Sequence, residues 1–203
     1  MIEAMIHGFI LAFGLILPLG VQNIFIFQQG ALQPNMTKAF PAIIAASLCD
    51  TFLISISVLG ITVVVLGSLW IRIGLLLAGI VFLLYMGFST WNSKHTDATD
   101  EERIAYSVKK QVTFAISVSL LNPHAIIDTA GVIGTSSLTY SGTEKAGFTI
   151  ACICVSWLWF TGLAYAGKMT GKLDKSGDLL LLFNKLSALV MWGTAVYLGI
   201  SLL

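Results

Sequence analysis

Hydrophobic residues in this chain are grouped in six long blocks separated by short polar connections. The blocks cover about residues 4–27, 40–66, 69–91, 112–134, 146–167 and 184–203. A helix needs about 20 apolar residues to cross the hydrocarbon core of a bilayer, whereas a strand of an outer-membrane barrel needs only about ten, alternating with polar ones. The pattern therefore predicts an all-α integral membrane protein with six transmembrane helices.

The composition indicates that most of the chain is surrounded by lipid. Of its 203 residues, 57% are hydrophobic and 10% are charged, and the mean hydropathy is +0.90; a soluble domain carries about 25% charged residues. The net charge of +1, without a dense basic cluster, argues against nucleic acid as a partner. The first block follows Glu3 and contains several amides, so we expect a retained helix and not a signal peptide.

Basic residues are concentrated in alternate connections. Lys38 follows the first block, and the third and fifth connections hold most other lysines, while the opposite connections hold only Arg72 and Lys145. Because positively charged connections stay on the cytoplasmic side, we expect these three connections in the cytoplasm and both termini outside. The third connection, residues 93–111, is the longest charged segment and is expected to be a solvated loop.

This loop divides the chain into two halves of three blocks each. An odd number of spans per half means that the second half enters the membrane from the opposite side, as in an inverted repeat. A shift of 105 residues places Pro18 on Pro123 and Asn23 on Asp128. We therefore expect one transporter domain, residues 1–203, in a 3+3 inverted repeat made of residues 1–92 and 112–203.

The first block of each half contains a proline among polar residues. Residues 18–23 read Pro-Leu-Gly-Val-Gln-Asn, and residues 122–124 read Asn-Pro-His. Proline removes a helical hydrogen bond and clashes with the preceding turn, so both helices should kink or open inside the membrane. Transporters often bind their substrate at such openings. A packing kink is the alternative, but two prolines at matched positions favour a binding site.

Two acidic residues, Asp50 and Asp128, lie inside predicted spans. A carboxylate in a bilayer is costly unless it is protonated, paired or facing water, so it indicates a substrate or ion pathway. His124 beside the second proline is a donor to a freed carbonyl group, a proton relay or a substrate contact.

Polar residues at helical spacing surround both acids. If the fourth block continues past its proline, one face carries Ser117, Leu121, His124, Asp128, Gly131 and Thr135; the second block carries Ser47, Asp50 and Ser57. Serine alone would indicate close helix packing, but with the acids these faces predict a cavity lining.

Other side chains suggest alternatives. The histidines and cysteines show no metal-ligand spacing, and we find no cofactor motif or nucleophile–base pair, which argues against an enzyme. Cys49 with Cys152 or Cys154 would suit a membrane thiol-redox carrier. Trp157 or Trp159 would suit a cation–π contact with a substrate, and an open channel would use the same polar faces.

These motifs resemble the lysine exporter (LysE) family of amino-acid efflux proteins, above all its arginine/lysine exporters. The resemblance covers nearly the whole chain and rests on residues 17–23 (Leu-Pro-Leu-Gly-Val-Gln-Asn), Gln29-Gly30, Asp50, residues 121–124 (Leu-Asn-Pro-His) and Asp128-Thr129. Members usually carry proline where this chain has Val21, and often an aromatic residue between the positions of His124 and Asp128.

The resemblance implies a secondary transporter in the bacterial inner membrane that exports basic amino acids, such as L-lysine and L-arginine, driven by the membrane potential or an ion gradient. Asp128 would bind the cationic group or a coupled proton in an antiport, with Asp50 as the second acid. Amides and freed N–H groups would bind the carboxylate. An exporter of neutral amino acids or other small solutes is the alternative.

No cofactor is implied, and the sequence leaves the oligomeric state open, a homo-oligomer included. The expected binding residues are Pro18, Gly20, Gln22, Asn23, Asp50, Asn122, Pro123, His124 and Asp128.

Overall fold

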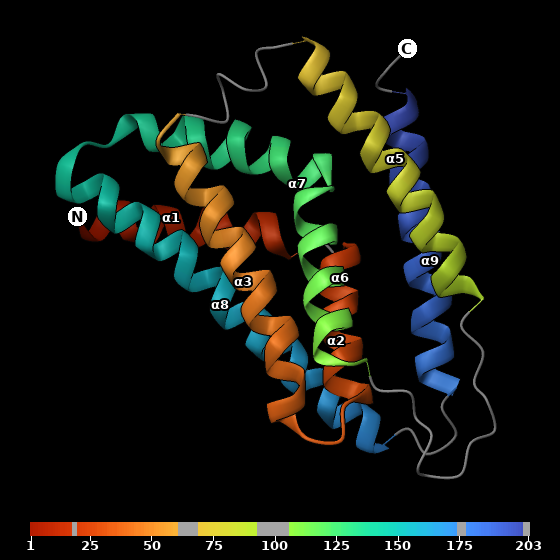
Figure 1. Ribbon diagram of the computed structural model, residues 1–203. Coiled ribbons are helices and arrows are strands. Elements are labelled where there is room, and N and C mark those ends of the chain that lie inside the picture. Colours follow the sequence, from red (N-terminus) through yellow and green to blue (C-terminus); the bar gives the residue numbers. More distant parts are fainter. Residues whose placement is uncertain (18–19, 61–68, 93–105, 174–177, 201–203) are drawn as a thin grey trace.

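The computed structural model describes residues 1–17, 20–60, 69–92, 106–173 and 178–200 (Figure 1). Every regular element in these ranges is helical, which confirms the all-α class. In chain order they are α1 (Ile2–Ile16), α2 (Val21–Leu32), α3 (Met36–Val58), α5 (Leu69–Trp91), α6 (Val108–Leu120), α7 (Pro123–Asp128), the π-helix η1 (Thr129–Gly134), the 3-10 turn η2 (Ser137–Thr139), α8 (Gly142–Leu173) and α9 (Asp178–Ile200).

The helices are apolar enough for a bilayer, but their lengths give fewer spans than expected. Among the described residues, Met36–Val58 and Gly142–Gly171 each qualify as a membrane span, and two bent helix pairs raise the number to four. α5 and α9 contain shorter apolar segments, Leu76–Phe88 and Ala188–Ile200. The sequence predicted six spans. Residues 61–66 of its second block and 93–105 of its charged loop lie outside the described residues.

Both bends lie where proline was expected to interrupt a helix. The axes of α1 and α2 differ by 81°, and Gly20, the N-cap of α2, has an extended backbone. α6 and the segment Ala125–Thr139 differ by 59°. α7 begins at Pro123, a first helical position at which a missing N–H costs nothing. The predicted spans therefore open into two helices each. Pro18 itself lies outside the described residues.

The second broken helix changes its type directly after Asp128, where the π-helix η1 begins. Because residues 117–135 do not form one straight helix, the single polar face expected from Ser117 to Thr135 is wrong. Asp128 lines the cavity described below, whereas Gly131 and Thr135 are exposed on the surface.

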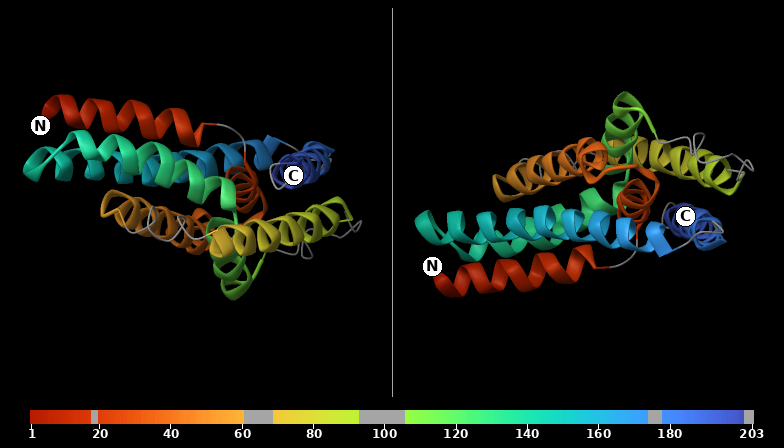
Figure 2. Two further views of the ribbon diagram at one scale, coloured as in Figure 1. Left: turned by 90° about the horizontal axis from the view of Figure 1, so that it is seen from above. Right: turned by 90° about the horizontal axis from the view of Figure 1, so that it is seen from below.

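α8 is the central helix of the fold, and it lies between α1 and α3 (Figure 2). It also packs along α2 with the two backbones in direct contact. A Cβ atom added to Gly30 would lie 1.9 Å from the Ala164 carbonyl oxygen, and one added to Gly167 would lie 2.0 Å from that of Phe27. Small residues at helix crossings in membranes allow this close approach.

Buried apolar side chains form three clusters. The first joins α2, α3, α6 and α8 around Phe25, Ile43 and Phe160. The second joins α1, α8 and the end of α3 around Phe148, and the third connects the α5–α9 pair to α2 and α6 around Leu83. In Figure 1 the α5–α9 pair stands at one edge of the molecule.

A buried polar joint connects α2, α3, α6 and α8 at one end of the fold. Gln33 Nε2 donates to the Tyr106 carbonyl oxygen (3.0 Å), and Gln111 Nε2 donates to the carbonyl oxygens of Tyr106 (2.8 Å) and Lys38 (3.0 Å). Lys168 Nζ donates to the Gln33 carbonyl oxygen (2.6 Å). These contacts bring Lys38 of α3, the start of α6 and Lys168 of α8 to the same end of the molecule.

Candidate functional site

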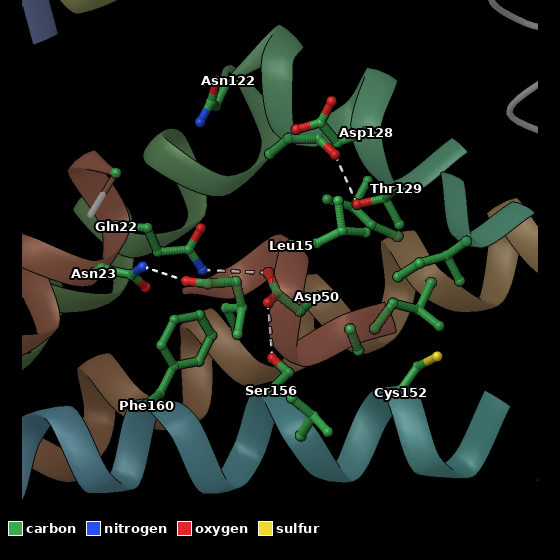
Figure 3. Close-up of a pocket in the computed structure, with 18 of the residues that line it drawn as sticks. Leu15, Gln22, Asn23, Asp50, Asn122, Asp128, Thr129, Cys152, Ser156 and Phe160 are labelled. Carbon is green, nitrogen blue, oxygen red and sulfur yellow. Dashed lines mark hydrogen bonds between the residues drawn. The ribbon is translucent and has the colours of Figure 1, made fainter. Parts of the chain in front are cut away.

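A cavity of about 350 Å³ lies where the three apolar clusters meet (Figure 3). This volume is within the range of about 300–1,000 Å³ that is typical of small-molecule sites. Apolar side chains from all three clusters line part of it. Its glycine, cysteine and polar lining residues are Gly20, Gln22, Asn23, Asp50, Asn122, Asp128, Thr129, Cys152, Ser156 and Thr194, which come from both broken helices and from α3, α8 and α9.

Two hydrogen bonds hold the Asp50 side chain at the cavity. It comes from the middle of α3, and its two carboxylate oxygens accept hydrogen bonds from two other helices. Ser156 Oγ of α8 donates to Oδ2 at 2.7 Å, and Gln22 Nε2 of α2 donates to Oδ1 at 3.3 Å. Because Ser156 is only 2% exposed, its bond to Asp50 is sheltered from solvent.

Asp128 and Asn122 lie on the wall opposite α8 (Figure 3). Asn122 lies in the break between α6 and α7, and its carbonyl oxygen accepts a hydrogen bond from the Ile126 N–H at 3.2 Å. Asp128 is the last residue of α7, directly before the π-helix. π-Helical turns are often found at functional sites. Both acids therefore face one cavity from different helices.

The start of α2 forms a third part of the wall. Gly20, Gln22 and Asn23 line the cavity, and the N-cap residue Gly20 has no side chain with which to cap this helix end. The first N–H groups of an α-helix have no acceptor within the helix and carry partial positive charge. This end can therefore accept an anionic group.

Asn23 has a structural contact in addition to its place in the wall. Its Nδ2 donates to the carbonyl oxygen of Ile16 at the end of α1 (2.7 Å), and its Oδ1 accepts from Trp159 Nε1 of α8 (3.2 Å). The amide, which was expected to bind substrate, lines the cavity and also bridges the break between α1 and α2.

The structure does not place the remaining expected residues in the cavity wall. Pro123 and His124 are the first two residues of α7, but their side chains are outside the described part of the chain. The polar face expected on α3 is wrong in part: Asp50 lines the cavity, while Ser47 and Ser57 are buried and are not lining residues. The Ser57 carbonyl oxygen instead packs against Gly134 of η1, which is the close helix packing that serine also predicts.

Sequence reasoning missed the contribution of α8 and α9. Ser156 and Thr194 line the cavity, although each is a single hydroxyl in an apolar segment. The only signal was a polar residue in a predicted span, and many such residues merely bond to their own helix, as Thr194 does through its contact with the Val190 carbonyl oxygen (2.8 Å). Their role depends on which helix faces them.

The tryptophan and cysteine alternatives gain no geometric support. Trp159 bonds to Asn23, and Trp157 Nε1 donates to Thr51 Oγ1 at 3.1 Å; neither indole is among the described residues that line the cavity. Cys49 and Cys152 are buried and Cys154 is exposed, all as free thiols.

A partly open cavity with a largely apolar lining and two carboxylates, lying between opened membrane helices, is typical of a protein that moves a small solute. Comparisons with known proteins agree. The family model described as LysE type translocator matches residues 13–202. The chain therefore belongs to the LysE family of translocators.

Individual relatives are similar over almost the full length. A Bacillus subtilis (strain 168) protein named "Putative amino-acid transporter YisU" is 56% identical over 200 residues, which cover 98% of this chain and 90% of that protein. Proteins named "Arginine exporter protein ArgO" from Salmonella paratyphi A and Salmonella typhimurium are each 30% identical over 204 residues, covering 98% of this chain and 94% of each relative. No solved structure matches.

The family and these relatives identify the chain as an amino-acid transporter of the membrane and not as an enzyme. A thiol-redox carrier is thereby set aside.

Proposed function

We propose that this protein exports basic amino acids, L-arginine and L-lysine in particular, from the bacterial cytoplasm as a secondary transporter of the inner membrane. The observation that carries the proposal is the pair Asp50 and Asp128, which line one cavity. A cationic side chain supplies the counter-charge that carboxylates inside a membrane protein require. The names of the Salmonella relatives also support a basic substrate.

In this arrangement, the cationic group and the carboxylate of the amino acid each contact a different wall of the cavity. Asp128 takes the cationic group or a coupled proton, and Asp50, held by Ser156 and Gln22, is the second acid. The start of α2 at Gly20, with the amides of Gln22 and Asn122, takes the carboxylate. Asn23 supports this wall from its position across the break, and Pro18, Pro123 and His124 belong to the segments that open the two helices.

Proton antiport is the coupling that these groups suit best. If one acid exchanges a proton for a cationic substrate, the charge of the site stays constant through the cycle, and the substrate-free cavity need not carry two negative charges. In proteoliposomes, an inward proton gradient should then drive arginine outward, and the Asp128→Asn variant should lose this gradient-driven transport. Equal transport with and without the gradient would instead indicate uniport driven by the membrane potential.

Two observations support a 3+3 inverted repeat with divisions at residues 1–92, 93–111 and 112–203. The first spans of both halves are broken: α1 and α2 differ by 81°, and α6 and the segment Ala125–Thr139 differ by 59°. The packing is reciprocal as well: α1 and α2 pack on α8, while α6 and η1 pack on α3, and α5 pairs with α9. In each half, the broken first span thus packs against the second span of the other half.

The decisive experiment is efflux from bacterial cells loaded with dipeptides that contain arginine or lysine. We expect the wild-type chain to export both amino acids against a gradient, and Asp50→Asn and Asp128→Asn to abolish export. Glu3→Gln is the matched control, because it removes an exposed acid outside the cavity. Export of neutral amino acids alone would refute the basic substrate, and flux that only follows the gradient would indicate a channel.

A further inference from the structure

Trp159 lies behind the cavity wall. Its indole Nε1 donates to Asn23 Oδ1 at 3.2 Å, and Asn23 lines the cavity with only 5% of its surface exposed. The Trp159 ring also meets Phe13 of α1 edge to face, with 5.6 Å between the centroids and 89° between the planes. One side chain of α8 therefore contacts both halves of the broken helix.

The hydrogen bond from Trp159 matters because the Asn23 side chain forms a second hydrogen bond through its Nδ2. Ile16 is the last residue of α1, and the final carbonyl groups of a helix lack partners within it. Asn23 Nδ2, from the first turn of α2, donates to the Ile16 carbonyl oxygen at 2.7 Å. An asparagine amide rotates broadly about its last torsion, so a donor on Oδ1 selects the orientation in which Nδ2 points at α1.

We propose that Trp159 is a positioning residue of the transport site. Its indole N–H orients Asn23, Asn23 joins α1 to α2, and the start of α2 is thereby held against the cavity at Gly20 and Gln22. The inference rests on the proposed function only in taking this cavity as the transport site; it does not depend on which amino acid is carried.

The chain offers a matched control in Trp157. Trp157 lies on the same helix, is partly buried like Trp159, and donates its Nε1 to Thr51 Oγ1 at a similar distance of 3.1 Å. Thr51, however, is not a lining residue of the cavity. Replacing either tryptophan with phenylalanine removes one indole donor and keeps an aromatic ring, so the two variants differ mainly in which partner is released.

The first test is transport by purified protein in liposomes, with arginine, lysine and leucine as the panel of amino acids. Trp159→Phe should raise KM for the transported amino acid about fivefold, the effect expected for one hydrogen bond, with Vmax per folded molecule nearly unchanged. Trp157→Phe should leave KM as in the wild type. Equal KM values for the two variants, or a fall in Vmax alone with Trp159→Phe, would overturn the proposal.

The second test needs no substrate and separates this inference from the proposed function. In thermal unfolding of the purified protein, Trp159→Phe should lower the melting temperature, but should lower it no further when Asn23→Ala is already present; Trp157→Phe should add its full effect to Asn23→Ala. Additive effects of Trp159→Phe and Asn23→Ala would overturn the contact. If Asn23→Ala does not accumulate, Asn23→Ser takes its place. A wild-type chain that transports none of the panel would refute the proposed function, while this cycle would still decide the role of Trp159.

Discussion

Single polar side chains in this protein gain their significance from the partner that another helix supplies. Ser156 and Ser47 are both buried serines, at 2% and 0% exposure. Ser156 Oγ donates to the Asp50 carboxylate at 2.7 Å, whereas Ser47 Oγ has no hydrogen-bond partner among the described residues. A buried hydroxyl with a charged partner contributes to stability and position, while one without a partner costs about 1–3 kcal/mol.

Replacing these two serines should therefore have opposite results. Ser156→Ala removes a hydrogen bond to a charged group, worth about 1.5–3 kcal/mol, and should raise KM for efflux by about tenfold or more. Ser156→Thr keeps the hydroxyl and should restore most of the activity. Ser47→Ala should leave KM unchanged and raise the melting temperature. Efflux kinetics and thermal unfolding measure the two effects, and a KM for Ser156→Ala equal to that of the wild type would mean that Asp50 does not need this donor.

At the scale of elements, the contact between α2 and α8 determines how the cavity is built. One wall of the cavity begins at Gly20, the N-cap of α2. From α8, Ser156 lines the cavity and Trp159 bonds to Asn23. The helices approach so closely that a Cβ on Gly167 would lie 2.0 Å from the Phe27 carbonyl oxygen, a distance that side chains do not reach. The backbone cannot relieve such a clash without separating the helices.

Gly167→Ala should accordingly destabilise the fold by about 1–3 kcal/mol or more, the usual cost of overpacking. Gly162 on the same helix has no neighbour within 4 Å of an added Cβ, so Gly162→Ala is the control and should melt at or slightly above the wild-type temperature, because alanine favours a helix more than glycine does. The comparison is made by thermal unfolding of the purified variants. Equal melting temperatures would contradict the close contact between α2 and α8.

At the scale of the whole molecule, the end that holds the amino terminus differs from the end that holds the lysines of the buried polar joint. The Met1 amine pairs with Glu144 at 3.0 Å, and His7 Nδ1 lies 2.8 Å from the Tyr140 hydroxyl, so the amino terminus and the start of α8 share one end. The buried polar joint lies at the other end, where α2 ends and α6 begins. There Gln111 contacts Lys38, and Lys168 contacts Gln33. Since basic connections stay inside, we infer that this joint faces the cytoplasm.

Cysteine labelling tests this orientation. In a chain whose three native cysteines have been replaced, a membrane-impermeant maleimide added to intact cells should label Glu144→Cys and leave Thr37→Cys unlabelled until the cells are opened. Both positions are exposed, so access to the side chain is not limiting. The reverse pattern would invert the proposed topology, and labelling of both positions in intact cells would contradict the separation of the two ends.

The sequence by itself determined the features that depend on composition and on covalent chemistry. Apolar blocks required helices and a bilayer, proline at position 123 allowed no continuous helix, and two acids in apolar segments indicated a pathway. The candidate site was predictable to the extent that Asp50, Asp128, Asn122 and Gln22 do line one cavity.

Only the tertiary structure decided which distant residues meet. Ser156 reaches Asp50, and Trp159 reaches Asn23, across 106 and 136 positions of the chain. Helical periodicity describes one face of one helix, but the partner of that face depends on crossing geometry and on glycines that let backbones touch. For the same reason the periodic serines of α3 were assigned to a cavity, although Ser57 packs against η1.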